Sequence, residues 1–201
     1  MLLVVHIMKK KDLALALYKN LQTVFSVKEL TLMFSEISYK NLKRRLNYLV
    51  KQGKLRSVRR GILVKESYSI RELVNKIYKP AYISLETVLL DEGINFQSYK
   101  SIFAVSYLNR EIEVDGTKIV YRRLKDEVLL NSLGVIRKEN YVIATKERAF
   151  LDAVYLYRNY CFDNLSVLDW KKVFDIAPIY KNKSFVKRVN SYYKIYKQEN
   201  V

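Results

Sequence analysis

The chain has 201 residues, half of them hydrophobic, and a formal net charge of +17 at pH 7. Its single cysteine, Cys161, excludes a disulfide framework and a cysteine-based zinc site, and it fits a reducing, cytoplasmic setting. Residues 1–66 carry a net charge of +11 and residues 67–201 only +6. This division is typical of a nucleic-acid module fused to a domain with a different partner.

An apolar segment, MLLVVHIM, opens the chain. It is too short to span a membrane and lacks the basic start of a signal peptide, so we expect it to pack on the first domain and expect no membrane association. Apolar residues then recur at helical spacing and predict a first helix over residues 12–24. They are Leu13, Leu17, Leu21 and Val24.

A capping box marks the start of a second helix. Ser26 is followed three residues later by Glu29, so each side chain can bond the other residue's backbone N–H. The helix is predicted to run to about Phe34, with Leu30, Met33 and Phe34 facing inward. A short turn over residues 35–37 then leads into a third helix.

The third predicted helix, between Ser38 and Gly53, begins the most basic stretch of the chain. Nine basic residues and no acidic residue lie between Lys40 and Arg60. Ser38 is the predicted N-cap, and Gly53 the predicted stop, because glycine enters the left-handed conformation without strain. The apolar residues form one face of this helix, namely Leu42, Leu46, Leu49 and Val50.

Two short runs that turn at Arg59, Arg60 and Gly61 predict a basic hairpin after this helix. Three helices followed by a hairpin are the plan of a winged helix-turn-helix, whose third helix enters the major groove of double-stranded DNA. We expect an operator of inverted repeats. A merely solvated helix is the alternative, although such helices usually mix glutamate with lysine. The predicted DNA-binding residues are Lys40, Asn41, Lys43, Arg44, Arg45, Tyr48, Arg56, Arg59 and Arg60.

A second predicted capping box, Ser69 to Glu72, opens a helix that must end before Pro80. We place the domain boundary here, with a winged helix-turn-helix over residues 1–68 and a mixed α/β domain over residues 69–201. A short extended piece at residues 81–83 precedes a helix, for which Ser84 is the predicted cap and Gly93 the predicted end.

From residue 101 the apolar period changes to two. Three strand-like runs, with Asp115-Gly116 as a hairpin turn, predict a small antiparallel sheet over residues 101–123. A strand at residues 141–143 and three helices follow, the first capped by Thr145 and the other two following Asp169 and Ser184. The basic residues of the last helix favour a solvated face over a DNA contact. The fold class is therefore predicted to be α+β.

Two motifs behind the predicted winged helix carry a family resemblance. They are Tyr82-Ile83-Ser84-Leu85-Glu86 and Ile143-Ala144-Thr145-Lys146-Glu147-Arg148-Ala149-Phe150-Leu151-Asp152. Over roughly residues 10–160, their order and spacing resemble the antitoxin of the AbiE abortive-infection system, in which YIS-x-E and A-T-P-E-K-A-L-x-D recur. Lys146 and Arg148 stand where that family has proline and lysine. These departures indicate a divergent branch with a different cognate toxin.

The resemblance implies a type IV toxin–antitoxin system acting in phage defence. Such an antitoxin is a transcriptional regulator that represses its own operon through the winged helix. Its second domain opposes a nucleotidyltransferase-like toxin without requiring a stable complex. The residues carried over from the motifs are Tyr82, Ser84, Glu86, Thr145, Glu147 and Asp152. A structural role is the alternative for them, because carboxylates in first turns and hydroxyls at caps stabilise helices.

Other function classes find less support. His6, the only histidine, lies in the apolar opening segment, which disfavours histidine-based acid–base chemistry. An acidic cluster around Glu111 and Lys118 resembles a metal-dependent nuclease site, but a hairpin turn explains its Asp115. We therefore expect no enzyme activity, cofactor or metal. The remaining alternative is a ligand-sensing winged-helix repressor without a toxin partner.

Overall fold

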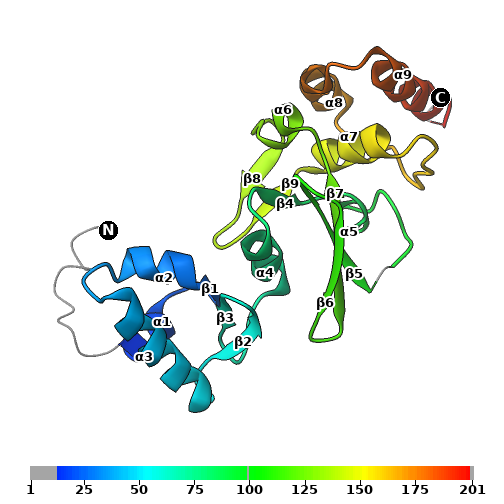
Figure 1. Ribbon diagram of the computed structural model, residues 1–201. Coiled ribbons are helices and arrows are strands. Elements are labelled where there is room, and N and C mark those ends of the chain that lie inside the picture. The colour runs from blue at the N-terminus through cyan, green and yellow to red at the C-terminus, as the bar shows by residue number, and fades with distance from the viewer. Residues whose placement is uncertain (1–12, 99, 200–201) are drawn as a thin grey trace. The chain divides into compact units, whose positions relative to one another are not determined.

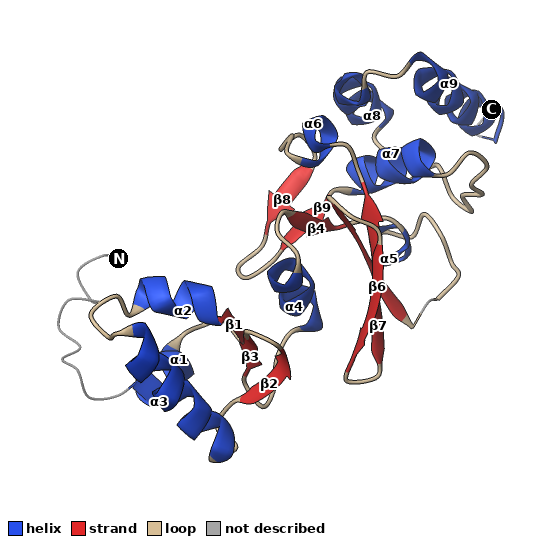
Figure 2. Cartoon of the chain, viewed as in Figure 1, coloured by secondary structure: helices blue, strands red, loops and turns tan. Residues whose placement is uncertain are grey.

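The computed structural model describes residues 13–98 and 100–199, and the chain has a mixed α+β fold. Within these residues it contains nine α-helices, a three-stranded antiparallel sheet and a six-stranded mixed sheet (Figures 1 and 2). The chain divides into two compact units between Lys76 and Ile77. The predicted packing extension MLLVVHIM lies outside the described residues. None of the helices in the described ranges is long and apolar enough to cross a membrane.

The first unit packs three helices against a small sheet of strand order β1-β3-β2. Its elements are α1 (Leu13–Lys19), β1 (Val24–Ser26), α2 (Val27–Met33), α3 (Tyr39–Lys51), β2 (Arg56–Arg59), β3 (Ile62–Val64) and α4 (Ile70–Ile77). Leucines from α1, α2 and α3 meet Phe25 and Leu63 of the sheet to form the core. The apolar face predicted for α3 is confirmed, since Leu42, Leu46 and Leu49 are buried.

The first helix is shorter than the spacing of its leucines predicts. It ends at Lys19, where the Asn20 side chain accepts a hydrogen bond from the backbone N–H of Gln22. Leu21 is 78% exposed, and Val24 lies in a strand opposite Val64. The inward placement of Met33 is also wrong, because its side chain is 43% exposed.

Local end signals were the most reliable part of the prediction in this unit. The capping box of α2 is confirmed, with Ser26 and Glu29 each accepting from the other's backbone N–H. Gly53 follows α3 with a φ of +71°, as a glycine stop requires. Ser38 is the N-cap of α3, but its side chain makes no capping hydrogen bond.

Helix α4 is tied to the first unit by a buried carboxylate. Glu72 is fully buried and accepts hydrogen bonds from the backbone N–H of Thr23 (2.9 Å), the Thr23 hydroxyl (2.7 Å) and the N–H of Val24 (3.1 Å). Only half of the predicted second capping box forms, because this carboxylate turns to β1 instead of Ser69. The compact units consequently divide eight residues after the predicted boundary at residue 68.

The second unit is built on a mixed sheet of strand order β6-β7-β5-β4-β9-β8. Its strands are β4 (Ala81–Ile83), β5 (Ser101–Ser106), β6 (Arg110–Val114), β7 (Thr117–Arg123), β8 (Val135–Arg137) and β9 (Val142–Ala144). Its helices are α5 (Glu86–Asp91), α6 (Asp126–Leu129), α7 (Lys146–Leu156), α8 (Trp170–Ile176), the 3-10 helix η2 (Ala177–Tyr180) and α9 (Lys183–Glu199). Helix α7 packs against α5, α8, α9 and β9.

The prediction of a small antiparallel sheet over residues 101–123 is wrong. Strands β6 and β7 form the predicted hairpin at Asp115-Gly116, but β7 folds back beside β5 and pairs with it in parallel. The burial pattern gives the reason. Ile119, Val120 and Tyr121 are buried in succession, as in a strand covered on both faces. Strand β6 exposes three charged residues, which suits a sheet edge.

Candidate functional site

The outer face of α3 gathers the predicted DNA-binding residues of the first unit. With its leucines in the core, the helix turns Lys40, Asn41, Lys43, Arg44, Arg45 and Tyr48 outward, and all six side chains are exposed. Among the described residues, no acidic side chain forms an ion pair with the basic residues of this helix. The face therefore presents positive charge that the surrounding chain leaves uncompensated.

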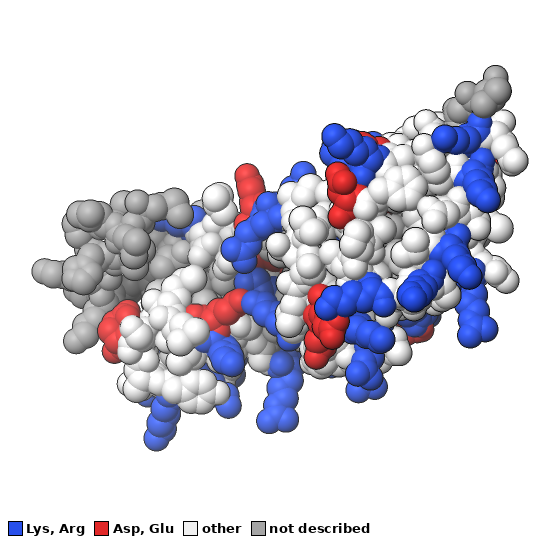
Figure 3. Space-filling model, turned by 90° about the horizontal axis from the view of Figure 1, so that it is seen from above, with Lys and Arg blue, Asp and Glu red and all other residues white. Residues whose placement is uncertain are grey.

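The hairpin after α3 carries the remaining three predicted contacts. Arg56, Arg59 and Arg60 are exposed, and the Arg56 guanidinium lies 5.8 Å from the centre of the Tyr68 ring. The register of β2 against β3 shifts between Ser57 and Arg59, where the strand is irregular. In Figure 3, Lys and Arg side chains project from the lower edge of the view with few Asp or Glu side chains beside them.

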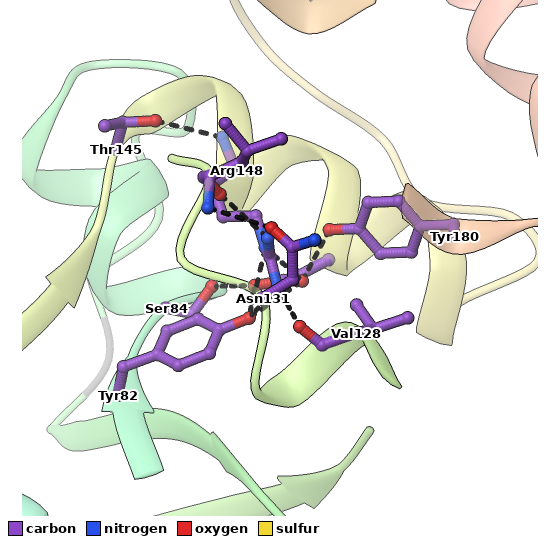
Figure 4. A network of polar contacts seen from close by, with 9 residues as sticks. Tyr82, Ser84, Val128, Asn131, Thr145, Arg148 and Tyr180 are labelled. Carbon is purple, nitrogen blue, oxygen red and sulfur yellow. Dashed lines mark hydrogen bonds and ion pairs between the residues drawn. The ribbon is translucent and has the colours of Figure 1, made fainter. Parts of the chain in front are cut away.

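The motif residues of the second unit lie inside it. Asp152 on α7 is fully buried and accepts hydrogen bonds from three hydroxyl groups. The donors are Ser84 (2.7 Å), Tyr82 (3.0 Å) and Tyr180 (2.6 Å). Figure 4 shows Tyr82, Ser84 and Tyr180 reaching this point from β4, the segment after it and η2.

Arg148 completes this buried cluster one turn before Asp152. Its Nε lies 3.3 Å from the Asp152 Oδ1, and its Nε and one terminal nitrogen donate to the Tyr82 hydroxyl. The same guanidinium donates to the backbone carbonyls of Val128 (2.7 Å) and Leu133 (2.8 Å). These contacts tie α7 to the chain between α6 and β8, where Figure 4 also shows Asn131.

Electrostatics follow from the complete burial of this ion pair. Burial has the largest single effect and lowers the pKa of Arg148, but Asp152, Tyr180 and Tyr82 together outweigh it, so the net pKa is raised. Burial also raises the pKa of Asp152, while Arg148 and the three hydroxyl donors act in the opposite direction. The arrangement gives Tyr82, Ser84 and Asp152 a structural task, and it keeps all three away from solvent.

The other three motif residues are not part of this cluster. Thr145 is the N-cap of α7 and accepts from the backbone N–H of Arg148, which confirms the predicted cap. Glu147 is buried and accepts from the N–H of Asp169 at 3.4 Å. Glu86 at the start of α5 has one carboxylate oxygen buried without a hydrogen-bond partner in the described chain.

Glu86 lies in an unusual environment for a carboxylate. Burial raises its pKa, and the nearby Tyr157 and Arg122 side chains only partly oppose this effect. Burial and the Glu86 charge together raise the pKa of Tyr157 to about 12. The predicted capping role of Ser84 is wrong, because its hydroxyl is held by Asp152. The N-cap position is taken by Leu85, whose φ is +57°.

The acidic cluster of the hairpin does not assemble a metal site. Glu111 pairs with Lys118 at 2.7 Å and with Arg122 at 3.2 Å, while Asp115 lies in the β6–β7 turn. Within residues 13–98 and 100–199, no three His, Cys, Asp or Glu side chains converge as a metal would require. Cys161 is exposed and unbridged.

Comparison with protein-family models and with curated proteins found no match to this chain.

The sequence analysis did not predict Arg148 and Tyr180, the two side chains that complete the buried cluster. Arg148 carried a signal, since it is a cation one turn before Asp152 on a predicted helix. Tyr180 carried no such signal, because its position in the sequence does not indicate that it contacts Asp152.

Proposed function

We propose that the first unit is a winged helix-turn-helix that binds double-stranded DNA, with α3 in the major groove and the β2–β3 hairpin along the backbone. The outer face of α3 is the observation that carries this proposal. Its thirteen residues extend over about 20 Å at 1.5 Å per residue and expose basic side chains along their whole length. Burial of the opposite face leaves this surface as the one available to a partner.

Position along α3 separates two roles. Lys40, Asn41 and Arg44 lie in the N-terminal half of the helix, the part that reads base edges in this class of protein. Arginine can bond guanine with two hydrogen bonds, and asparagine can do the same with adenine. Arg56, Arg59 and Arg60 on the hairpin are assigned to phosphates, which give affinity without sequence preference.

A salt titration of binding to the upstream DNA of its own operon tests this proposal. If about five to eight phosphates are contacted, log K falls with log salt at a slope of about −4.5 to −7. Arg44→Ala costs about 1–3 kcal/mol and relaxes one base preference, whereas Arg59→Ala weakens all sequences alike. Arg137→Ala, an exposed arginine of the second unit, is the matched control. A slope near zero, or indifference to Arg44→Ala, rejects the assignment.

We further propose that the protein is a repressor and antitoxin of a type IV system, opposing a nucleotidyltransferase-like toxin through its second unit. The support is the order of the two motifs behind the basic unit. A ligand-sensing repressor is the alternative.

Co-expression with the neighbouring gene distinguishes these two functions. An antitoxin restores growth when that gene encodes a nucleotidyltransferase-like toxin, and the Arg44→Ala variant still does so if protection resides in the second unit. Absence of any such neighbour, or absence of rescue by the folded full chain, favours the sensor.

A further inference from the structure

The outer face of the last helix, α9, carries a line of lysines. Phe185 and Val189 bury the opposite side of this helix, and Phe185 contacts the rings of Tyr155 and Tyr180. At 100° per residue, Lys183, Lys187 and Lys194 fall within about 40° of one another. All three side chains are exposed. The one acidic residue of α9 is Glu199, at its C-terminal end.

This line repeats the pattern of α3. On α3 the residues Lys40, Arg44, Asn47 and Lys51 stand at positions i, i+4, i+7 and i+11. On α9 the residues Lys183, Lys187, Asn190 and Lys194 stand at the same intervals. In both helices the line lies opposite the buried face, and its members are exposed.

The uncompensated charge of this line is a property of the described chain. No ion pair within residues 13–98 and 100–199 involves Lys183, Lys187 or Lys194. Arg188, by contrast, is held inside the unit by the backbone carbonyl of Val154.

The charge and spacing of the three lysines favour a nucleic acid over a membrane or a protein as their partner. A membrane-surface helix inserts its apolar face, but Phe185 and Val189 of α9 are already buried in its own unit. Among the described residues of α9, only Val186 and Ile195 flank them as exposed apolar side chains. Lysine is depleted at protein interfaces, and no large exposed aromatic residue anchors this line. Lysines spaced over about 16 Å of a straight helix instead match a row of phosphates along a duplex.

We infer that α9 is a second, sequence-independent binding surface for the phosphate backbone of double-stranded DNA, made by Lys183, Lys187 and Lys194. This inference does not rest on the role proposed for α3, because the two helices belong to separate compact units. It assigns to the second unit a nucleic-acid contact beyond the antitoxin role.

The test compares four full-length proteins on a 40-bp duplex of arbitrary sequence. They are the parent, K183Q/K187Q/K194Q, K40Q/R44Q/K51Q and the combination of both triple variants. The matched control is K100Q/K125Q/K138Q, which removes the same charge from three exposed lysines of the second unit outside α9. Emission of Trp170, the only tryptophan, reports the fold of the second unit, and circular dichroism reports the helix content of each whole protein. The single variants K187Q and K194Q serve if a triple variant is unfolded.

The α9 variant is expected to lower affinity about 10–100-fold at 0.1 M salt, and to make the log–log salt slope shallower by about 2–3. Each single variant accounts for about 0.9 of that slope. Binding of this DNA duplex equal to that of the control overturns the inference. If the α3 variant binds like the control while the α9 variant does not, the α3 proposal fails and this inference stands.

Discussion

Arginine has opposite surroundings in the two units. Arg44 on α3 is exposed and has no ion pair in the described chain, whereas Arg148 on α7 is fully buried with its guanidinium bonded on several sides. A solvated cation remains available to another molecule. A desolvated cation must be compensated by its own chain, because an unpaired buried charge is very costly. The first unit therefore offers the charge of Arg44 outward, and the second unit uses the charge of Arg148 to join its own elements.

Removal of the buried carboxylate is the strongest test of this contrast. Asp152→Ala leaves the guanidinium of Arg148 and three hydroxyl donors without their acceptor. We expect it to lower the free energy of unfolding of the second unit by about 3–5 kcal/mol. Denaturant unfolding followed by Trp170 emission measures this loss, and Asp175→Ala, at an exposed position, is the control. A loss below about 1 kcal/mol contradicts a structural role for the cluster.

The first unit has its own buried carboxylate, and it tests where that unit ends. Glu72→Ala removes the acceptor of two backbone N–H groups and one hydroxyl, so a cost of about 2–3 kcal/mol is expected. Hydrogen exchange at the amides of Thr23 and Val24 should quicken, while Trp170 emission should remain that of the parent. Glu66→Ala, at an exposed site, is the control.

The same contact predicts the behaviour of fragments. Residues 1–76 retain Glu72 and the Lys76–Glu29 ion pair, whereas residues 1–68 lose both. We expect the longer fragment to fold and bind DNA without antitoxicity, and the shorter one to be markedly less stable. Circular dichroism and DNA binding compare them. Equal stability of the two fragments would show that α4 does not belong to the first unit and that the unit ends at residue 68.

Arg148→Lys introduces the lysine found at this position of the AbiE antitoxin motif. It measures how much the guanidinium contributes to stability beyond its single positive charge. A single ammonium group cannot reach Val128, Leu133, Tyr82 and Asp152 together, so a cost of about 1–2 kcal/mol is expected. The exposed Arg137→Lys is the control, with urea unfolding as the measurement. A variant as stable as the parent shows that one charge suffices and that the forked geometry is dispensable.

These results show which parts of the structure local sequence signals could predict. The capping box at Ser26, the glycine stop at Gly53 and the cap at Thr145 depend on residues three or four positions apart, and all are present. The apolar face of α3 has the same local origin. Such features depend only on neighbouring residues, so they can be predicted without knowledge of the tertiary fold.

Contacts between residues far apart in the chain could not be predicted from the sequence. The parallel pairing of β5 with β7 depends on which strand can be covered on both faces, and this is decided by the whole sheet. Glu72 finds Thr23 at a separation of 49 residues, and Tyr82 finds Asp152 at 70. The motifs named Tyr82, Ser84 and Asp152 without indicating that they meet. The local pattern therefore predicts a helix cap at Ser84, whose hydroxyl instead donates to Asp152.

Substitution of Glu86 has the smallest expected effect on stability. It compares a buried carboxylate that has one oxygen without a hydrogen-bond partner among the described residues with the fully hydrogen-bonded carboxylate of Asp152. Burial raises the pKa of Glu86 above the ordinary 4.5, so between these values the folded state holds a proton that the unfolded state has released. The free energy of unfolding must therefore fall as pH rises through that interval. Glu86→Gln cannot ionise, so its stability relative to the parent should increase with pH, by less than about 1 kcal/mol in total. Urea unfolding at pH 4 and pH 7.5 measures the difference, and the exposed Glu92→Gln is the control. A difference that is the same at both pH values would mean that Glu86 titrates normally and that its buried oxygen finds a partner in solution.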